Sequence, residues 1–319
     1  MSKYQFLLPA YKPEFLAEAL KSIQQQTYRD FSCLVSDDCS RANLKLIFDQ
    51  TVGDDSRFSF RRNKVNMGSE SLVAHWNLLV NMCDSPYLIM ASDDDWYDSS
   101  FLSEIDALTE KYPETRVFRG GARRIYRDGE SFFEDYKWHE WVSSLHFTFD
   151  MFSTYYIHCM ANYVFQTSSI QANGGFIDYP LAWFSDDATV LRESVNGVAN
   201  TPDVVFSFRY SQLNLSDNIA ETSANNWSKY QATIKFYDWV MAFLKSFETN
   251  LPVSDRVYHK VSIWGIRGKV EEQVWACLPK MSYSQFKIAY KWLSQQGFID
   301  GIIKKIQIMR CWLSNRLKK

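Results

Sequence analysis

The residues of this sequence whose type and spacing could do chemistry are three groups of adjacent aspartates: Asp37-Asp38, Asp93-Asp94-Asp95 and Asp186-Asp187. Carboxylates this close repel one another and raise one another's pKa, and a bound divalent cation relieves that repulsion. Their hard oxygen atoms suit Mg²⁺ or Mn²⁺. The alternative is structural, because aspartates in turns can also cap the helix that follows.

The elements around the first two groups predict how those groups are positioned. Short apolar runs predict strands at residues 4–8, 31–35, 58–62, 87–90 and 117–118, with Pro9 expected to break the first. Apolar residues at helical spacing predict helices between these strands. Such alternation implies right-handed crossovers and a mostly parallel sheet. Ligands of such a sheet bind beyond the carboxyl ends of its strands, which is where both groups are expected.

The pattern changes after about residue 121. Asp128-Gly129 predicts a hairpin turn, and a further strand is expected at residues 204–208. Beyond residue 222 the spacing is helical: apolar residues recur at steps of four and three, as in Tyr230, Ile234, Tyr237, Met241 and Leu244. We therefore expect an α/β domain over residues 1–221 and a helical C-terminal region over residues 222–319.

Composition and missing motifs exclude several classes of protein. The chain has 319 residues with 35 Lys plus Arg against 37 Asp plus Glu, a formal net charge of −2, which argues against a dedicated nucleic-acid-binding protein. The sequence has no Gly-rich dinucleotide fingerprint, no Walker A loop and no zinc-protease motif, so the corresponding enzyme classes are not expected.

The expected compartment is the cytoplasm. The six cysteines include no C-x-x-C pair, and a domain of this size needs no disulfides. The apolar run near the N-terminus is too short for a signal-peptide core, and no stretch approaches the roughly 20 apolar residues of a membrane-spanning helix.

The motifs, taken in order, resemble those of family 2 glycosyltransferases with the GT-A fold, over roughly residues 4–215. The resemblance depends on five segments: LPAY at 8–11, ALKSIQQQTY at 19–28, VSDDCS at 35–40, NMG at 66–68 and SDDDWY at 92–97. It implies that residues 1–120 form a nucleotide-binding half and residues 121–221 an acceptor half of one GT-A domain.

The resemblance also implies a nucleotide-diphosphate-sugar donor and a divalent metal, Mg²⁺ or Mn²⁺. Asp38 would hydrogen-bond the base, Asp93 would face the ribose, and Asp94 or Asp95 would hold the metal. Ala91 stands where the commoner family motif has its first Asp, so the assignment among the three aspartates stays open. The implied donor-binding residues are Pro9, Ala10, Tyr11, Asp38, Asn66, Gly68 and Asp93.

The family's catalytic base lies in a later acidic pair, usually Glu-Asp. Here Asp186-Asp187 takes that place, so either carboxylate could be the base. The implied reaction is an inverting transfer to a saccharide or lipid-linked saccharide acceptor in surface polysaccharide assembly. Two alternatives stay open: a sugar nucleotidylyltransferase, and a carbohydrate-binding protein without catalysis.

The C-terminal segment, residues 299–319, predicts a basic amphipathic helix. One apolar arc contains Ile302, Ile303, Ile306, Met309, Leu313 and Leu317, with basic residues outside it and no acid after Asp300. Such a helix can lie in the interface of a membrane with Trp312 at the boundary, here at the inner face of the cell membrane. The alternative is that the apolar arc packs against the rest of the protein.

Overall fold

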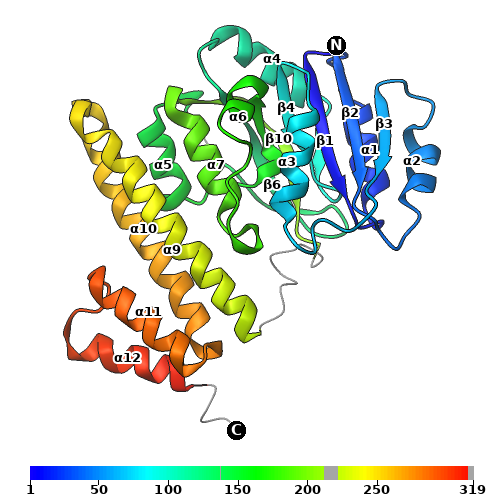
Figure 1. Cartoon of the computed structure of the whole chain (residues 1–319). Helices are drawn as coiled ribbons and strands as arrows, with labels where there is room; N and C mark the ends of the chain where they lie inside the picture. Colours follow the sequence, from blue (N-terminus) through cyan, green and yellow to red (C-terminus); the bar gives the residue numbers. More distant parts are fainter. Residues whose placement is uncertain (137, 212–221, 315–319) are drawn as a thin grey trace.

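The computed structural model describes residues 1–136, 138–211 and 222–314. It is a mixed α/β fold in which a central, mostly parallel sheet is followed by a helical region (Figure 1). Four neighbouring parallel strands form one half of the sheet in the order β3-β2-β1-β4. Their bounds are β1 Tyr4–Ala10, β2 Phe31–Asp37, β3 Phe58–Arg62 and β4 Tyr87–Met90.

Helices cover both faces of this half-sheet, because alternate residues of each strand point to opposite faces. In β1, Phe6 and Leu8 pack in a core with α1 (Leu16–Gln24), α2 (Leu44–Val52) and α4 (Phe101–Lys111). Leu7 packs in a second core with α3 (Leu72–Met82). Side chains that accept backbone N–H groups begin two of the helices: Asn43 for α2 and Ser71 for α3.

The first strand is longer than predicted. Residues 4–8 were expected, with a break at Pro9, but β1 continues through Ala10 in parallel register with β2. Proline is tolerated where no ladder hydrogen bond is required from its nitrogen. The extra two residues carry the chain to the edge where the aspartates lie.

The second half of the sheet contains β9 (Tyr163–Gln166), β6 (Val117–Ile125), β10 (Val198–Arg209) and the short β5 (Trp96–Tyr97). β9 runs antiparallel to both β4 and β6, whereas β10 pairs parallel with β6. The predicted hairpin joins β6 to β7 (Ser131–Glu134), and Gly129 at its turn has φ +92, which favours glycine. β8 (Trp141–Val142) pairs with β10.

Three helices accompany this half: α5 (Ser144–Ser153), α6 (Thr167–Ala172) and α7 (Ser185–Glu193). The helical region follows with α9 (Ser223–Ser246), α10 (Arg256–Cys277), α11 (Tyr283–Gln295) and α12 (Gly301–Leu313). α9 and α10 lie side by side, and α10 packs on α5, while α11 and α12 lie at the end farther from the sheet (Figure 1). One continuous core joins these helices to α3, α5 and α7.

The last helix packs with a face other than the predicted apolar arc. Trp312 is 8% exposed, stacks on Phe286 of α11 with ring centroids 4.6 Å apart and donates its indole N–H to the Met281 carbonyl at 3.1 Å. The expectation that Trp312 lies at a membrane boundary is therefore wrong. Ile302 and Ile303 of the arc are each 71% exposed, and Leu317 lies outside the described residues.

Among the described residues, no helix is both long enough and apolar enough to span a membrane.

Candidate active site

A cavity of about 930 Å³ lies at the carboxyl ends of the parallel strands. The three aspartate groups, which are up to 150 positions apart in the chain, meet around it, except that Asp37 is not part of its wall. Every residue singled out for a site in the sequence lines this cavity: Pro9, Ala10, Tyr11, Asp38, Asn66, Gly68, Asp93, Asp94, Asp95, Asp186 and Asp187.

Asp37 and Asp38 have different surroundings although they are adjacent. Asp37 is fully buried, forms an ion pair with Arg62 and accepts the Ser40 backbone N–H, so it stabilises the turn after β2. Asp38 faces the cavity and holds the opposite loop. Its carboxylate accepts the backbone N–H groups of Met67 at 2.9 Å and Gly68 at 2.7 Å.

Gly68 approaches Asp38 so closely that a side chain would not fit easily. A Cβ built on Gly68 would lie 3.0 Å from the Asp38 Oδ2 atom. The Asp38 carboxylate also accepts the Asn63 side-chain N–H at 2.8 Å. The NMG motif is therefore positioned by the carboxylate of the preceding strand end, and the two motifs form one wall of the cavity.

Asp93 fixes the loop after β1. Its Oδ2 atom accepts the backbone N–H groups of Tyr11 at 2.9 Å and Lys12 at 2.8 Å. The Lys12 ammonium lies 2.5 Å from Asp94 Oδ2 and 3.3 Å from Asp93 Oδ1. Lys12 therefore partly neutralises the acidic cluster, and its pKa is raised by Asp93 and Asp94 despite the opposing effect of burial.

All three aspartates of this cluster are about 95% buried. Burial raises the pKa of Asp93 and, more strongly, that of Asp95, and the charge of Asp94 adds to both shifts. Asp95 accepts the Arg209 backbone N–H at 2.9 Å, and the Arg209 side chain donates to the Asp94 carbonyl at 2.9 Å. The end of β10 is thereby joined to the cluster.

The third group also lines the cavity and lies in the first turn of α7. Asp186 and Asp187 are half-buried. Burial raises the pKa of Asp186, although backbone N–H groups at the start of the helix oppose the shift. Burial and the charge of Asp186 raise the pKa of Asp187 well above its usual value, and Lys269 of α10 opposes this.

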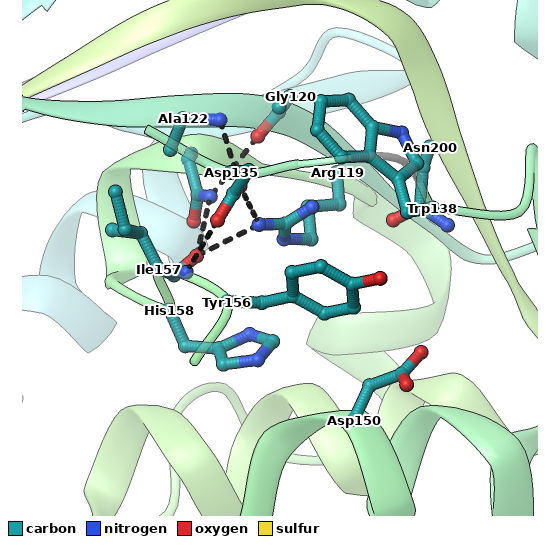
Figure 2. A network of polar contacts seen from close by, with 12 residues as sticks. Arg119, Gly120, Ala122, Asp135, Trp138, Asp150, Tyr156, Ile157, His158 and Asn200 are labelled. Carbon is teal, nitrogen blue, oxygen red and sulfur yellow. Dashed lines mark hydrogen bonds and ion pairs between the residues drawn. The ribbon is translucent and has the colours of Figure 1, made fainter. Parts of the chain in front are cut away.

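The cavity floor is the segment 159–161, which a buried polar network holds from behind (Figure 2). Arg119 of β6 is 1% exposed and pairs with Asp135, and it donates to the Ile157 carbonyl at 3.0 Å. Asp135 in turn accepts the Ile157 N–H at 2.8 Å. Asn162 donates to the Ile157 and Gly120 carbonyls, so both ends of the segment are fixed.

The same network contains a carboxyl with an unusual proton affinity. Burial raises the pKa of Asp150 to about 7, and Arg119 opposes the shift. The Arg119 guanidinium lies 5.5 Å from the centroid of the Tyr156 ring, and this ring lies between Arg119 and Asp150 (Figure 2). None of these side chains lines the cavity, so the network supports the floor and does not contact a ligand there.

Sequence reasoning missed several cavity residues. Lys12 follows a motif that had been singled out, so its position was a usable signal. Lys269 and Gln273 of α10 line the cavity although they lie in the helical region, where nothing in the local sequence distinguishes them. The apolar part of the wall was also missed: Leu72, Trp76, Met160, Leu181, Trp183, Phe184 and Phe208.

This α/β fold, with its cavity at the carboxyl ends of the parallel strands, is the GT-A fold. Residues 6–164 match the model of glycosyl transferase family 2, and the chain belongs to that family. Sugar transfer is thus the class of reaction that the match supports, whereas nucleotidyl transfer and non-catalytic carbohydrate binding receive no support. No curated protein matches the chain by sequence.

Solved structures show the same fold at low sequence identity. Residues 1–349 of S. aureus TarS in complex with UDP-GlcNAc superpose with a TM-score of 0.60 and 12% identity, over 99% of this chain and 92% of that one. The mannosyltransferase PcManGT from Pyrobaculum calidifontis, in complex with GDP-Man and Mn²⁺, gives a TM-score of 0.56 and 11% identity, over 100% and 88%.

We predict that Asp38→Ala destabilises the fold. The substitution leaves the N–H groups of Met67 and Gly68 and the buried side-chain N–H of Asn63 without their acceptor, and a buried unsatisfied donor costs about 1–3 kcal/mol. Urea denaturation would measure the free energy of unfolding. Asp49→Ala is the control, because its ion pair with Lys45 is exposed and contributes less than about 1 kcal/mol. Equal losses in both variants would show that Asp38 does not hold the loop.

Proposed function

We propose that this protein is an inverting glycosyltransferase that moves a sugar from a nucleotide-diphosphate donor to a saccharide acceptor in surface polysaccharide assembly. The observation that carries the proposal is the convergence of two separate acidic groups, Asp93–Asp95 and Asp186-Asp187, on one cavity. Inverting transfer needs both: one group at the departing diphosphate and one at the incoming hydroxyl. Residues 1–120 would bind the nucleotide, and residues 121–221 would bind the acceptor.

The donor would lie along the loops after β1 and β2. Pro9, Ala10, Tyr11, Asn66 and Gly68 form that part of the wall and would enclose the base and ribose. Asp38 and Asp93 each accept two backbone N–H groups. A carboxylate has about four acceptor positions, so the remaining ones would be available to the nucleotide. The Lys12 ammonium is close enough to the acidic cluster to contact the diphosphate.

The acidic cluster fits a divalent metal shared with the diphosphate. Among the described residues, no group of three or more His, Cys, Asp or Glu is placed to hold a metal alone. Mg²⁺ typically needs only one or two carboxylates when substrate phosphates supply further oxygens. Burial and, to a smaller extent, the charge of Asp94 raise the pKa of Asp95, so a cation at this place would stabilise its ionised form. Asp94 and Asp95 would therefore hold Mg²⁺ or Mn²⁺, which would neutralise charge on the leaving diphosphate.

At the start of α7, Asp186 or Asp187 would act as the general base. Its carboxylate takes the proton of the acceptor hydroxyl while that oxygen bonds to the anomeric carbon. The sugar–phosphate bond breaks on the opposite face, so one displacement inverts the configuration. The apolar part of the wall would reduce the contact of a bound sugar with water, which would strengthen the electrostatic interactions that the reaction requires.

The function is tested by adding UDP-, GDP- and dTDP-sugars to the protein with Mn²⁺ or Mg²⁺ and measuring released nucleotide. We expect one donor class to be turned over only with metal, and its nucleotide to raise the melting temperature; ligand at 100 times Kd stabilises by about 2.7 kcal/mol. Asp94→Asn and Asp95→Asn should reduce the metal dependence, with Asp49→Asn as control. No release and no stabilisation by any donor would refute the proposal.

We predict that Asp186→Asn or Asp187→Asn lowers kcat by about 10²–10⁴-fold while nucleotide affinity is unchanged. The base must be ionised, so wild-type kcat should rise as pH increases through the raised pKa of the pair. Stability should change in the opposite direction. A raised folded pKa stabilises below the unfolded pKa, and that contribution is lost as pH rises through the folded pKa. Full activity in both variants would leave the reaction without this base.

A membrane contact through the C-terminal segment is the second part of the proposal. The outward face of α12 carries Ile302 and Ile303, each 71% exposed, Ile306 at 47% and Met309 at 40%. Exposed Lys305 and Arg310 flank this apolar row, and α12 contains no acidic residue. Apolar side chains beside cations suit an anionic lipid surface, where each Lys or Arg contributes about 1 kcal/mol. A lipid-linked acceptor would be presented at such a surface, at the cytoplasmic side of the cell membrane.

Vesicle co-sedimentation tests this contact. We expect the wild-type protein to bind phosphatidylglycerol-containing vesicles and to release them at high salt. A double variant, Ile302→Glu with Ile303→Glu, should bind at least about tenfold more weakly, because the apolar surface is lost and two repelling charges are added. The matched control is Ile288→Glu on α11, which is 54% exposed and lies outside the row. Equal binding by the double variant and the control would refute the contact.

A further inference from the structure

The segment just before the acidic pair has an unusual backbone. In the part of the chain that the structure describes, four non-glycine residues have positive φ, and three of them are Leu181 at +60°, Ala182 at +55° and Phe184 at +65°. Side chains other than glycine are strained in this left-handed region. Such residues persist only where the surrounding structure holds them, and they cluster at functional sites.

The helical region provides what holds this segment. The Phe184 ring stacks on Phe236 of α9 with centroids 4.5 Å apart and an interplanar angle of 5°. The Lys229 ammonium, also on α9, lies 4.8 Å from the centroid of the Trp183 ring. α9 packs along this segment, and Phe236 is fully buried. α9 therefore clamps the strained backbone through its contacts with Trp183 and Phe184.

The segment is also part of the cavity wall. Leu181, Ala182, Trp183 and Phe184 line it together with Asp186 and Asp187. Phe184 precedes α7 and its carbonyl accepts the Ala188 N–H at 3.0 Å, so the conformation of this residue sets the direction in which the first turn starts. A change in the backbone at residues 181–184 would move the two carboxylates relative to the donor loops.

We propose that the strained turn 181–184, clamped by Phe236 of α9, is a positioning device that aims the acidic pair at the acceptor hydroxyl. The inference rests on the proposed function, since it assigns a role to the base of that reaction. It also makes the helical region part of the catalytic centre, although the family match ends at residue 164. Leu181, Ala182, Phe184 and Phe236 are positioning residues: they act through the aspartates.

Glycine substitution separates positioning from stability. Glycine adopts the left-handed conformation without strain, so Ala182→Gly should keep or raise the melting temperature. The same substitution frees the backbone, and small misplacements of reacting groups are costly, so kcat should fall by about tenfold to a hundredfold. Nucleotide affinity in the presence of Mn²⁺ should be unchanged. A merely structural segment would show no loss of kcat in a variant that is as stable as the wild type.

A second pair of variants isolates backbone freedom from the loss of a side chain. Leu181→Asn and Leu181→Gly both remove the leucine, and both new residues tolerate the left-handed conformation, but asparagine restricts the backbone more than glycine does. We expect kcat of the glycine variant to be about tenfold below that of the asparagine variant. Equal kcat values in the pair, or wild-type kcat in Ala182→Gly, would overturn the proposal.

Hydrogen exchange keeps this test independent of the proposed function. Amides of residues 181–187 should exchange faster in Ala182→Gly and in Phe236→Leu than in the wild type, whereas the strands of the sheet stay protected. If no nucleotide sugar is turned over by the wild type, the proposed function fails and the exchange data still report on the clamp. Unchanged exchange at residues 181–187 in both variants would overturn the clamp itself.

Discussion

The constraint on which the rest of the structure depends is the burial of several carboxylates around one cavity. Negative charges removed from water destabilise the fold unless donors or cations surround them. The protein meets this requirement with its own backbone: Asp38 binds the loop of Gly68, and Asp93 binds the loop after β1. Lys12 supplies the nearest positive charge. The loops that form the cavity therefore take their shape from the carboxylates that they surround.

The two acidic groups, Asp93–Asp95 and Asp186-Asp187, differ in the hydrogen-bond donors and cations that surround their carboxylates. Asp93–Asp95 receive backbone N–H groups and a lysine, which suits a site that accepts a charged ligand repeatedly. Burial and the charge of Asp186 raise the pKa of Asp187 well above its usual value, and Lys269 opposes this shift. A carboxylate with raised proton affinity is a better proton acceptor near neutral pH. Burial of charge thus acts on both groups, and in the proposed reaction one group would bind the donor while the other would accept the proton.

Much of the donor side could be predicted from the sequence, because the signals are local. The strand at residues 87–90 coincides with β4, and apolar runs that end in aspartates placed both groups at the same sheet edge. The contribution of α10 to the cavity could not be predicted in this way. Lys269 reaches the cavity only through the packing of α10 on α5, a contact between elements about 110 residues apart. The left-handed turn at 181–184 contains no glycine, so no residue type in the sequence indicated it.

The C-terminal helix shows a different reason for failure. The spacing of Ile302, Ile303 and Ile306 correctly indicated an amphipathic helix, but helical periodicity does not say which surface of a helix meets the protein. The face of α12 that packs on the protein is the one that carries Trp312. Its ring stacks on Phe286 of α11, and its indole N–H donates to the Met281 carbonyl. Shape and hydrogen bonding at one aromatic residue outweighed a longer row of smaller apolar side chains.

The two faces of the sheet lead to separate cores, one with α1, α2 and α4 and the other with α3, α7 and the C-terminal helices. α9 and α10 pack in the second core, whereas α1 and α2 pack in the first. A lineage could therefore alter α10, and with it the part of the cavity wall formed by Lys269 and Gln273, while the packing of α1 and α2 stays intact. Because the two faces of the sheet carry separate cores, one part of the protein can change during evolution while the other keeps its packing, although both belong to one continuous sheet.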